Sequence, residues 1–582
     1  MYKIFSGILS QRITSLASAL GWLSPEQKRF LPGVRGVQEH TAVLQTVVET
    51  AKAGKRDLGV AWLDLANAFG SIPHGVLSEL FSSLPLPPTV KKLVRDIYTR
   101  NELDFVLKRE RITIFPTSGV RQGDALSCKI FNLAAEPLLR AAKSPVNPGF
   151  LAYGCFVKAT AYADDIAVMT ESADDLQLVL DDLSTTAGYL GLKFNARKCT
   201  CLALKKGCSA EVQVSINANT IRCLGPNEQE SFLGVPIGSK LRFRVPTSVV
   251  GLMDKVLTSL LAPWQKMEVL RSHLLPSLSN EQGSGRVLKE TLTLLDNECA
   301  KNFRSIFHLP DSSTTPYFYA DRKVGALGLT SLSEDADIWT IARAAQLLTS
   351  SDPTVSTISW CQLHKTIRSG LRITGKENLP VKEFLSGSID EGGVYRLRYG
   401  SNPTTNLWSL TRKAAMRLKV QFDVSGDQSI RLIADNIAVL PLKAIKGLRL
   451  AVRQRWTKEL ASKPHQGRVA SGLVLDPSKD NSRVRAGNGG LSIIEWQLLH
   501  RCRLDLLPLR GYPWSIGDNK SCPRCFEGTE TAVHITNHCK MGLQLSTKRH
   551  NSVLDLLSSL MVSNRWQQRS TMQNQTLFCD QT

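Results

Sequence analysis

Two short apolar stretches of the chain end in acidic residues. Residues 58–63 form a continuous apolar run that stops at Asp64, and residues 161–170 form two apolar runs around a polar break at Asp164 and Asp165. The first pattern predicts a buried strand. The second predicts a β-hairpin with the two acids at its tip.

A helix start is predicted soon after the first run. Ser71 is suited to cap a helix, and Pro73 fits its first turn. This places Asp64 at the C-terminal end of its strand. Two further acidic pairs, at 174–175 and 181–182, fall in a segment with helical leucine spacing and are interpreted as a solvated helix face.

The three acids Asp64, Asp164 and Asp165 are candidates for a metal site. A buried hairpin tolerates paired ionised groups poorly unless a cation compensates them. If the first strand lies beside the hairpin, the three carboxylates converge and can hold two Mg²⁺ ions, an arrangement suited to phosphoryl transfer. Taken alone, residues 162–165 are a weak match, and a plain turn explains them equally well.

A glycine-containing segment lies between the two acidic sites. In residues 118–127, Gly123 allows close backbone approach to a ligand, Arg121 and Gln122 offer donors to phosphates or base edges, and Asp124 can cap a helix. These features predict a platform for template and nucleotide.

An aromatic side chain follows the first acid by five residues. Phe69 is a candidate to lie against the sugar of an incoming nucleotide, where its ring would exclude a 2′-hydroxyl and select deoxynucleotides. A core aromatic that closes the strand-to-helix turn is the simpler reading of this residue alone.

Two later segments carry further candidates. Residues 191–199 place Lys198 in a turn, where it could protonate departing pyrophosphate as a general acid, although a surface lysine is commoner. Residues 232–234 (Phe-Leu-Gly) could grip a primer strand or simply belong to the core.

Taken in order, these motifs resemble those of reverse transcriptases. Five blocks carry the resemblance: Asp64 with Ala68-Phe69, Arg121 to Asp124, Tyr162 to Asp165, Gly191 to Lys198, and Phe232 to Gly234. Residues 31–41 resemble the extra fingers segment of non-LTR (type-1) retrotransposable elements, in particular the lineage that inserts into ribosomal RNA genes. Ala125 and Cys128 stand where that family usually has proline, and Gly70 where it has aspartate, but no metal ligand is lost.

The resemblance implies an α+β right-hand polymerase with fingers, palm and helical thumb, followed by a mostly helical linker region and a zinc knuckle. It also implies further contacts at the active site. The Leu65 carbonyl is a candidate to join the metal ligands, and three cations are weaker candidates for triphosphate contacts from the fingers: Arg35, Lys55 and Arg56.

A second metal site is predicted near the C-terminus. Cys522, Cys525, His534 and Cys539 follow the spacing C-x2-C-x8-H-x4-C, which suits a structural tetrahedral Zn²⁺ site, and His538 leaves a Cys2His2 alternative open. In the resembled lineage such a knuckle precedes a restriction-like endonuclease, so nuclease activity is implied. No acidic nuclease core is recognisable after the knuckle, and the chain is expected to be a fragment of a longer polyprotein.

Composition fits a nucleic-acid enzyme. The 582 residues carry a net charge of +21, which favours a polyanionic partner, and residues 443–456 concentrate basic side chains that could lie on phosphates or form a solvated helix. No apolar run reaches membrane length. The 13 cysteines lack a secretory context, so an intracellular and, from the DNA target, nuclear location is expected.

Four regions are expected along the chain. These are fingers and palm at 1–240, a helical thumb at 241–330, a basic linker region at 331–510, and a zinc knuckle with the start of a truncated endonuclease region at 511–582. A polar, turn-rich stretch at 464–490 is interpreted as a linker or mobile loop.

The sequence therefore predicts an RNA-directed DNA polymerase that uses two Mg²⁺ ions to copy element RNA from the 3′-hydroxyl of nicked genomic DNA with deoxynucleoside triphosphates. Two alternatives stay open. One is a catalytically inactive nucleic-acid-binding fragment of a retroelement. The other is an RNA-dependent RNA polymerase, which would need room for the 2′-hydroxyl that Phe69 is expected to block.

Overall fold

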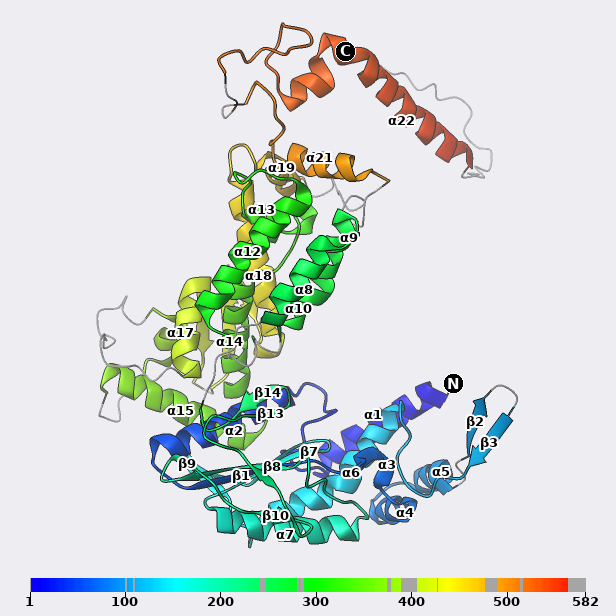
Figure 1. Ribbon diagram of the computed structural model, residues 1–582, viewed down its shortest axis with the longest axis vertical. Coiled ribbons are helices and arrows are strands. Elements are labelled where there is room, and N and C mark those ends of the chain that lie inside the picture. Colours follow the sequence, from blue (N-terminus) through cyan, green and yellow to red (C-terminus); the bar gives the residue numbers. More distant parts are fainter. Residues whose placement is uncertain are drawn as a thin grey trace. The chain divides into compact units, whose positions relative to one another are not determined.

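The apolar runs predicted as strands in the first 240 residues belong to a six-stranded sheet (Figure 1). The computed structural model describes residues 2–563, leaving out 100–101, 108–109, 241–246, 280–281, 283–286, 374–377, 389–405, 427, 477–489, 513–514 and 516. The sheet order is β12-β8-β1-β7-β6, and β9 also pairs with β8. Its strands are β1 (Leu58–Leu63), β6 (Ala159–Tyr162), β7 (Asp165–Thr170), β8 (Thr200–Lys205), β9 (Cys208–Ala210) and β12 (Arg222–Cys223).

Both faces of β1 are buried, which explains why its sequence is a continuous apolar run rather than an alternating one. Ala61 and Leu63 join a core with helices α6 (Ala125–Ala142) and α7 (Ala173–Tyr189). Val60 and Trp62 point to the other face and join a core with α2 (Gly36–Ala53). In Figure 1, α7 and α2 accordingly lie on opposite sides of the sheet.

The two helices behind the sheet both begin at a side-chain cap, and the one at Asp124 was predicted. The Asp124 carboxylate accepts a hydrogen bond from the Leu126 amide and caps α6. Ser172 caps α7, and the acidic pairs at 174–175 and 181–182 lie on this helix, as expected. Leu178 is the exception to the predicted apolar stripe, because it is exposed.

The predicted helix start after Asp64 needs a correction. A short turn of helix, α3 (Ala68–Ser71), ends at Ser71, whose hydroxyl donates to the Ala66 carbonyl instead of capping the next helix. Helix α4 (His74–Ser83) begins three residues later with Pro73 at its N-cap. The remaining elements of this region are α1 (Tyr2–Ala19), which packs on α6, α5 (Pro88–Thr99), and the hairpin β2 (Leu103–Leu107) and β3 (Glu110–Ile114).

Smaller hairpins complete the first 240 residues. They are β4 (Phe150–Ala152) with β5 (Cys155–Val157), β10 (Ser215–Ile216) with β11 (Asn219–Thr220), and β13 (Glu230–Phe232) with β14 (Val235–Ile237). Phe232 is buried in the core on the α2 side of the sheet, and Leu233 and Gly234 form the tight turn that follows it.

The chain forms two compact units that are interleaved in sequence. The first contains Met1–Ser259, Met267–Cys299 and Leu329–Arg455, and the second contains Leu260–Lys266, Ala300–Gly328 and Trp456–Thr582. Helices follow the sheet region, within the stretch at 241–330 that was predicted to be helical. They are α8 (Thr247–Thr258), α9 (Pro263–Val269), a π-helical turn at Leu270–Leu274, α10 (Leu275–Ser277) and α12 (Lys289–Phe307).

The rest of the first unit is helical, except for a three-stranded sheet that was not predicted from the sequence. Helices α14 (Leu332–Leu348), α15 (Pro353–Leu371), α16 (Val381–Ser386) and α17 (Leu407–Leu418) share a core with a three-stranded sheet of β15 (Val420–Val424), β16 (Ile430–Ala434) and β17 (Ile437–Val439). The alternation of buried Val420, Phe422, Ile430 and Leu432 with exposed neighbours is the period-2 signal of these strands.

The basic stretch at 443–456 forms most of α18 (Ala444–Ala461). Arg449 makes a two-pronged ion pair with Asp335, and Arg455 pairs with Glu334. These two cations therefore hold α18 against α14, so they do not form a free surface for phosphates.

The second unit contains an aromatic core and the C-terminal cysteines. Trp496 stacks on Phe307, and the ring of His500 packs edge-on against both. Its helices are α13 (Pro316–Tyr319), α19 (Arg468–Leu475), α21 (Ile493–Arg503) and α22 (Leu543–Ser563). Helix α19 lies inside the stretch interpreted as a loop at 464–490, and residues 477–489 of that stretch lie outside the described residues. Of the described helices, none has the length and apolar character to span a bilayer.

Candidate active site and Cys-His cluster

The three predicted acids meet where β1 ends and β7 begins. In the antiparallel pairing of β1 with β7, Leu63 lies opposite Ile166, so Asp64 comes directly after the last paired residue of β1 and Asp165 directly before its partner on β7. Asp164 occupies the turn between β6 and β7, where Tyr162 pairs with Asp165. Residues a hundred positions apart in sequence are thus brought together by strand register.

The loop at residues 191–199 lies beside Asp64. The Asn195 amide donates to the Asp64 carbonyl, and the Ala66 amide donates to the Lys193 carbonyl. The Lys198 ammonium then lies 3.7 Å from an Asp64 carboxylate oxygen. Because this pairing does not use the Leu65 carbonyl, that oxygen faces away from the loop and stays a candidate ligand.

The acids influence one another electrostatically. The pKa of Asp165 is raised, first by partial loss of water around the carboxyl and then by the negative charge of Asp164, with a further contribution from Asp64. Arg29 opposes this shift. A shared cation would relieve the repulsion among the three carboxylates.

Two residues near the acids have no counterpart in the sequence prediction. The guanidinium of Arg29 lies 4.8 Å from the centre of the Tyr162 ring. The Gln27 carboxamide accepts a hydrogen bond from the Ala163 amide at 2.8 Å. No local pattern marks either residue, because their partners lie more than 130 positions away.

The glycine-containing segment lies on the Asp64 side of the fold. The Val120 amide donates to the Phe69 carbonyl, and Gly119 lies so close to Gly70 that a Cβ would come within 3.0 Å of its backbone. Phe69 stacks on Phe131 of α6 with ring centres 4.2 Å apart. This contact fits the core-aromatic reading and leaves the sugar-excluding role a prediction.

The predicted donors of this segment have different surroundings. Arg121 donates to the Ile97 carbonyl, which ties it to α5, whereas Gln122 and Gly123 are exposed. Gly123 has φ +78°, a conformation that glycine adopts without strain. Gln122 is therefore accessible to a ligand.

Two of the three fingers cations lie away from the acids. Lys55 and Arg56 precede β1, whose six residues put them about 20 Å from Asp64. Arg56 pairs with Glu171 and donates to the Leu151 carbonyl, and Arg35 donates to the Leu442 carbonyl. The assignment of Lys55 and Arg56 to the triphosphate is corrected, because both belong to the opposite end of the sheet.

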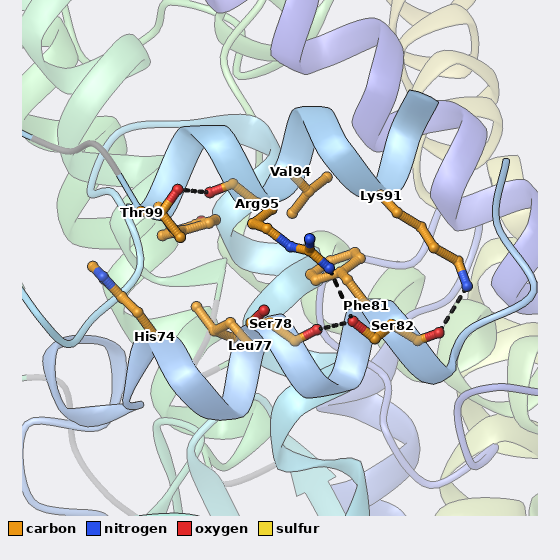
Figure 2. A pocket seen from close by; sticks show the side chains of 10 residues that line it. His74, Leu77, Ser78, Phe81, Ser82, Lys91, Val94, Arg95 and Thr99 are labelled. Carbon is orange, nitrogen blue, oxygen red and sulfur yellow. Dashed lines mark hydrogen bonds between the residues drawn. The ribbon is translucent and has the colours of Figure 1, made fainter. Parts of the chain in front are cut away.

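A shallow groove lies between α4 and α5 (Figure 2). Lys91 donates to the Ser82 carbonyl and Arg95 to the Ser82 hydroxyl, so both cations are used to join the two helices. None of the three acids lines this groove, and it is separate from the candidate active site.

The four predicted zinc ligands come together in the second unit. The ligand atoms of Cys522, Cys525, His534 and Cys539 all lie within 4.8 Å of one another. Cys522 and Cys539 sulfurs are 4.0 Å apart, and the Cys525 sulfur lies 3.2 Å from His534 Nε2. Ligand atoms on one tetrahedral Zn²⁺ are separated by about 3.5–3.8 Å, so these spacings straddle the expected value.

The thiols of the cluster differ in pKa. Backbone N–H groups of Glu527 and Gly528 lower the pKa of Cys525 to about 6, whereas loss of water around the thiol raises the pKa of Cys539. Between the two histidines considered, the structure brings His534 into the cluster, while His538 is exposed and outside it.

The architecture and the acids define a class. A mainly antiparallel sheet backed by helices, with acids after the end of one strand and at the neighbouring hairpin turn, is the palm of a right-hand polymerase, and the fold is α+β. Residues 1–237 match the family of reverse transcriptases (RNA-dependent DNA polymerases).

The relatives that this chain matches are polyproteins of retrotransposable elements. The chain is 29% identical over 333 residues to the type-1 retrotransposable element R2 polyprotein of Nasonia vitripennis, covering 56% of this chain and 32% of the relative. It is 27% identical over 400 residues to the R2 polyprotein of Bradysia coprophila, covering 67% and 44%. The R2DM polyprotein of Drosophila melanogaster is 27% identical over 346 residues, covering 57% and 32%. These relatives are polyproteins of R2 retrotransposable elements, and the part of this chain that matches the reverse transcriptase family is residues 1–237.

The chain spans between 32% and 44% of the length of these three relatives. Among solved structures, it is similar to telomerase of Candida tropicalis, in complex with a fragment of telomeric RNA, with TM-score 0.31 and 10% identity over 61% of this chain and 56% of that one. The corresponding Candida albicans telomerase has TM-score 0.29 and 12% identity over 63% and 54%.

Proposed function

We propose that the chain is the RNA-directed DNA polymerase of a non-LTR retrotransposon, which copies element RNA into DNA from the 3′-hydroxyl of nicked genomic target DNA. The observation that carries the proposal is that Asp64, just after β1, lies close enough to Asp165, at the start of β7, for its charge to raise the pKa of Asp165, with Asp164 next to it in the turn. A nuclear site of action follows from the genomic primer.

The acids fit a pair of Mg²⁺ ions. Oxygen ligands are what Mg²⁺ prefers. The pKa of Asp165 is raised, first by partial loss of water and then by the charge of Asp164, and a bound cation would offset both effects. Asp64, Asp164 and Asp165 would hold the ions, with the Leu65 carbonyl as an added ligand. Bound there, the ions would activate the primer hydroxyl and neutralise charge on the phosphates.

The protein's own side chains supply the remaining steps. Lys198 is mostly exposed and reaches Asp64, so it can hold a proton beside the leaving pyrophosphate. Gln122, at the exposed start of α6, would contact template or nucleotide, with Arg121 and Gly123 shaping its loop. Phe69 would limit space at the sugar 2′ position.

The C-terminal region would add a nucleic-acid-binding element. Cys522, Cys525, His534 and Cys539 would hold a structural Zn²⁺, and this site would stabilise a segment with few buried apolar residues. Its neighbour α22 carries Lys548 and Arg549, both exposed, which suit phosphate contacts. Endonuclease activity is proposed for the longer polyprotein of this type.

Primer extension tests the proposed function directly. The chain is incubated with Mg²⁺ and dTTP on oligo(dT) annealed to poly(rA) or to poly(dA). Extension on poly(rA) that requires Mg²⁺ is expected. Binding of the primer-template without extension would instead favour a catalytically inactive nucleic-acid-binding fragment.

Phe69→Ala is expected to relax sugar selection. Removing the ring opens space for a 2′-hydroxyl, so the preference for dTTP over UTP, measured as a ratio of kcat/KM values, should fall by about tenfold or more. Phe131→Leu, which removes only the stacking partner of Phe69, is the control for lost core packing. An unchanged ratio in Phe69→Ala would assign Phe69 to the core, and a preference of the unaltered chain for UTP would favour an RNA polymerase.

A further inference from the structure

A short segment before α2 runs along the free edge of the central sheet. Gln27 forms a parallel bridge with Ala161 of β6. The Lys28 amide donates to the Ala161 carbonyl, and the Ala161 amide donates to the Glu26 carbonyl. We call residues 24–30 the edge segment, since they extend the sheet beside the strand that leads into the Asp164 turn.

One face of α6 fixes the edge segment. Glu136 accepts from the Ser24 amide and hydroxyl, Asn132 donates to the Arg29 carbonyl, and Lys129 donates to the Phe30 carbonyl. The three α6 residues are spaced by three and four positions and so project from the same side of the helix. The edge segment is therefore anchored at both ends.

The middle of the edge segment is held by a buried ion pair with residues outside α6. The Lys28 ammonium is buried and lies 2.5 Å from a Glu39 carboxylate oxygen and 2.8 Å from one of Asp352. Breaking such a buried pair is costly, because it leaves uncompensated charge. With its neighbour held in this way, Gln27 has little freedom to move.

The Gln27 side chain is hydrogen-bonded to the turn that carries the acids. Its side-chain oxygen accepts from the Ala163 amide at 2.8 Å, and its side-chain nitrogen lies 3.4 Å from the Ala163 carbonyl oxygen. Ala163 has φ +59°, a left-handed conformation that costs a non-glycine residue free energy. Gln27 is only 3% exposed and Ala163 only 1%, so water cannot readily replace these contacts.

We propose that Gln27 is a positioning residue of the polymerase, which holds Ala163 in its left-handed conformation and thereby sets Asp164 and Asp165 for cation binding. The inference rests on the proposed function. Without the carboxamide, the buried Ala163 amide loses its partner and the turn can relax toward negative φ. The two carboxylates that follow would then move relative to Asp64.

Gln27→Ala is compared with a matched control, Gln177→Ala. Gln177 of α7 also grips one backbone residue, accepting from the Ser215 amide at 2.8 Å and donating to the Ser215 carbonyl at 3.0 Å, but it has no contact with the acidic turn. Gln27→Ala should lower kcat on poly(rA)/oligo(dT) by about tenfold and raise the half-saturating Mg²⁺ concentration about threefold, while the KM for dTTP at saturating Mg²⁺ changes little. Gln177→Ala should change neither kcat nor the Mg²⁺ requirement.

Rescue separates positioning from loss of stability. Glycine adopts positive φ at little cost, so Ala163→Gly added to Gln27→Ala should recover about threefold in kcat. Ala163→Gly added to Gln177→Ala should recover none. Equal effects of the two glutamine variants on the Mg²⁺ requirement, or absence of rescue, would overturn the inference.

Mn²⁺ binding to the whole chain, measured by electron paramagnetic resonance without substrates, gives a readout independent of polymerisation. Gln27→Ala should weaken Mn²⁺ binding about threefold relative to Gln177→Ala. If the unaltered chain extends no primer, the proposed function fails, yet this comparison still decides the role of Gln27. Equal Mn²⁺ affinity in the two variants would contradict it.

Discussion

Asp164→Asn is expected to lower primer extension by about a thousandfold, which corresponds to about 4 kcal/mol of lost transition-state stabilisation. The amide keeps the shape of the side chain but removes a negative charge at the turn between β6 and β7. Asp64→Asn should have an effect of similar size, because it removes the ligand on the facing strand. Steady-state extension on poly(rA)/oligo(dT) at saturating Mg²⁺ measures both.

The chain provides matched controls for this result. Asp174→Asn and Asp181→Asn remove acids from exposed positions of α7, on the same unit but away from the sheet edge. Both should keep activity within about twofold, as surface substitutions usually do. Equal activity of Asp164→Asn and Asp174→Asn would contradict the assignment of Asp164 as a Mg²⁺ ligand.

Cys525→Ser is expected to abolish zinc binding by the C-terminal cluster. The unaltered chain should contain one Zn²⁺ per molecule by elemental mass spectrometry, since four ligands already lie within 4.8 Å. Serine cannot supply the thiolate that the Glu527 and Gly528 amides stabilise, so the metal content should fall to near zero. Residues 517–542 should then become sensitive to limited proteolysis, because small zinc modules depend on the metal for their fold.

The two histidines make the zinc test specific. His534→Ala should lose the metal, and His538→Ala should retain it, because only His534 joins the cluster. Cys208→Ser, which alters an exposed cysteine of β9, controls for the loss of a thiol. Loss of zinc in His538→Ala with retention in His534→Ala would show that the Cys2His2 alternative is the right ligand set.

The acidic site could be predicted from sequence because each of its parts has a local signal. A strand buried on both faces reads as a continuous apolar run, and a hairpin turn reads as a polar break, so Asp64 and Asp164 stand out. The turn that carries Lys198 and the Asp124 cap of α6 are likewise encoded by neighbouring residues. That these parts come together in one site could be predicted only from the resemblance to reverse transcriptases.

Features that depend on long-range contacts were not predictable in this way. Gln27 and Arg29 stand in a polar stretch without periodicity, and their role depends on a parallel bridge to Ala161. Lys55 and Arg56 were expected to contact the triphosphate from the fingers, but they precede β1 and so lie at the end of this strand opposite Asp64. The strands at 420–439 did carry alternation, but the resemblance implied a mostly helical linker region there.

Iron-directed cleavage tests the central claim, that three distant acids share one pair of cations. Fe²⁺ substituted for Mg²⁺, with ascorbate and peroxide, generates radicals that cut the backbone near the bound ion. The account predicts cuts near residue 64 and near residue 164 in the same preparation, both suppressed by excess Mg²⁺ and both lost in Asp64→Asn. Cleavage at one of these positions alone, or cleavage at 164 that persists in Asp64→Asn, would contradict it.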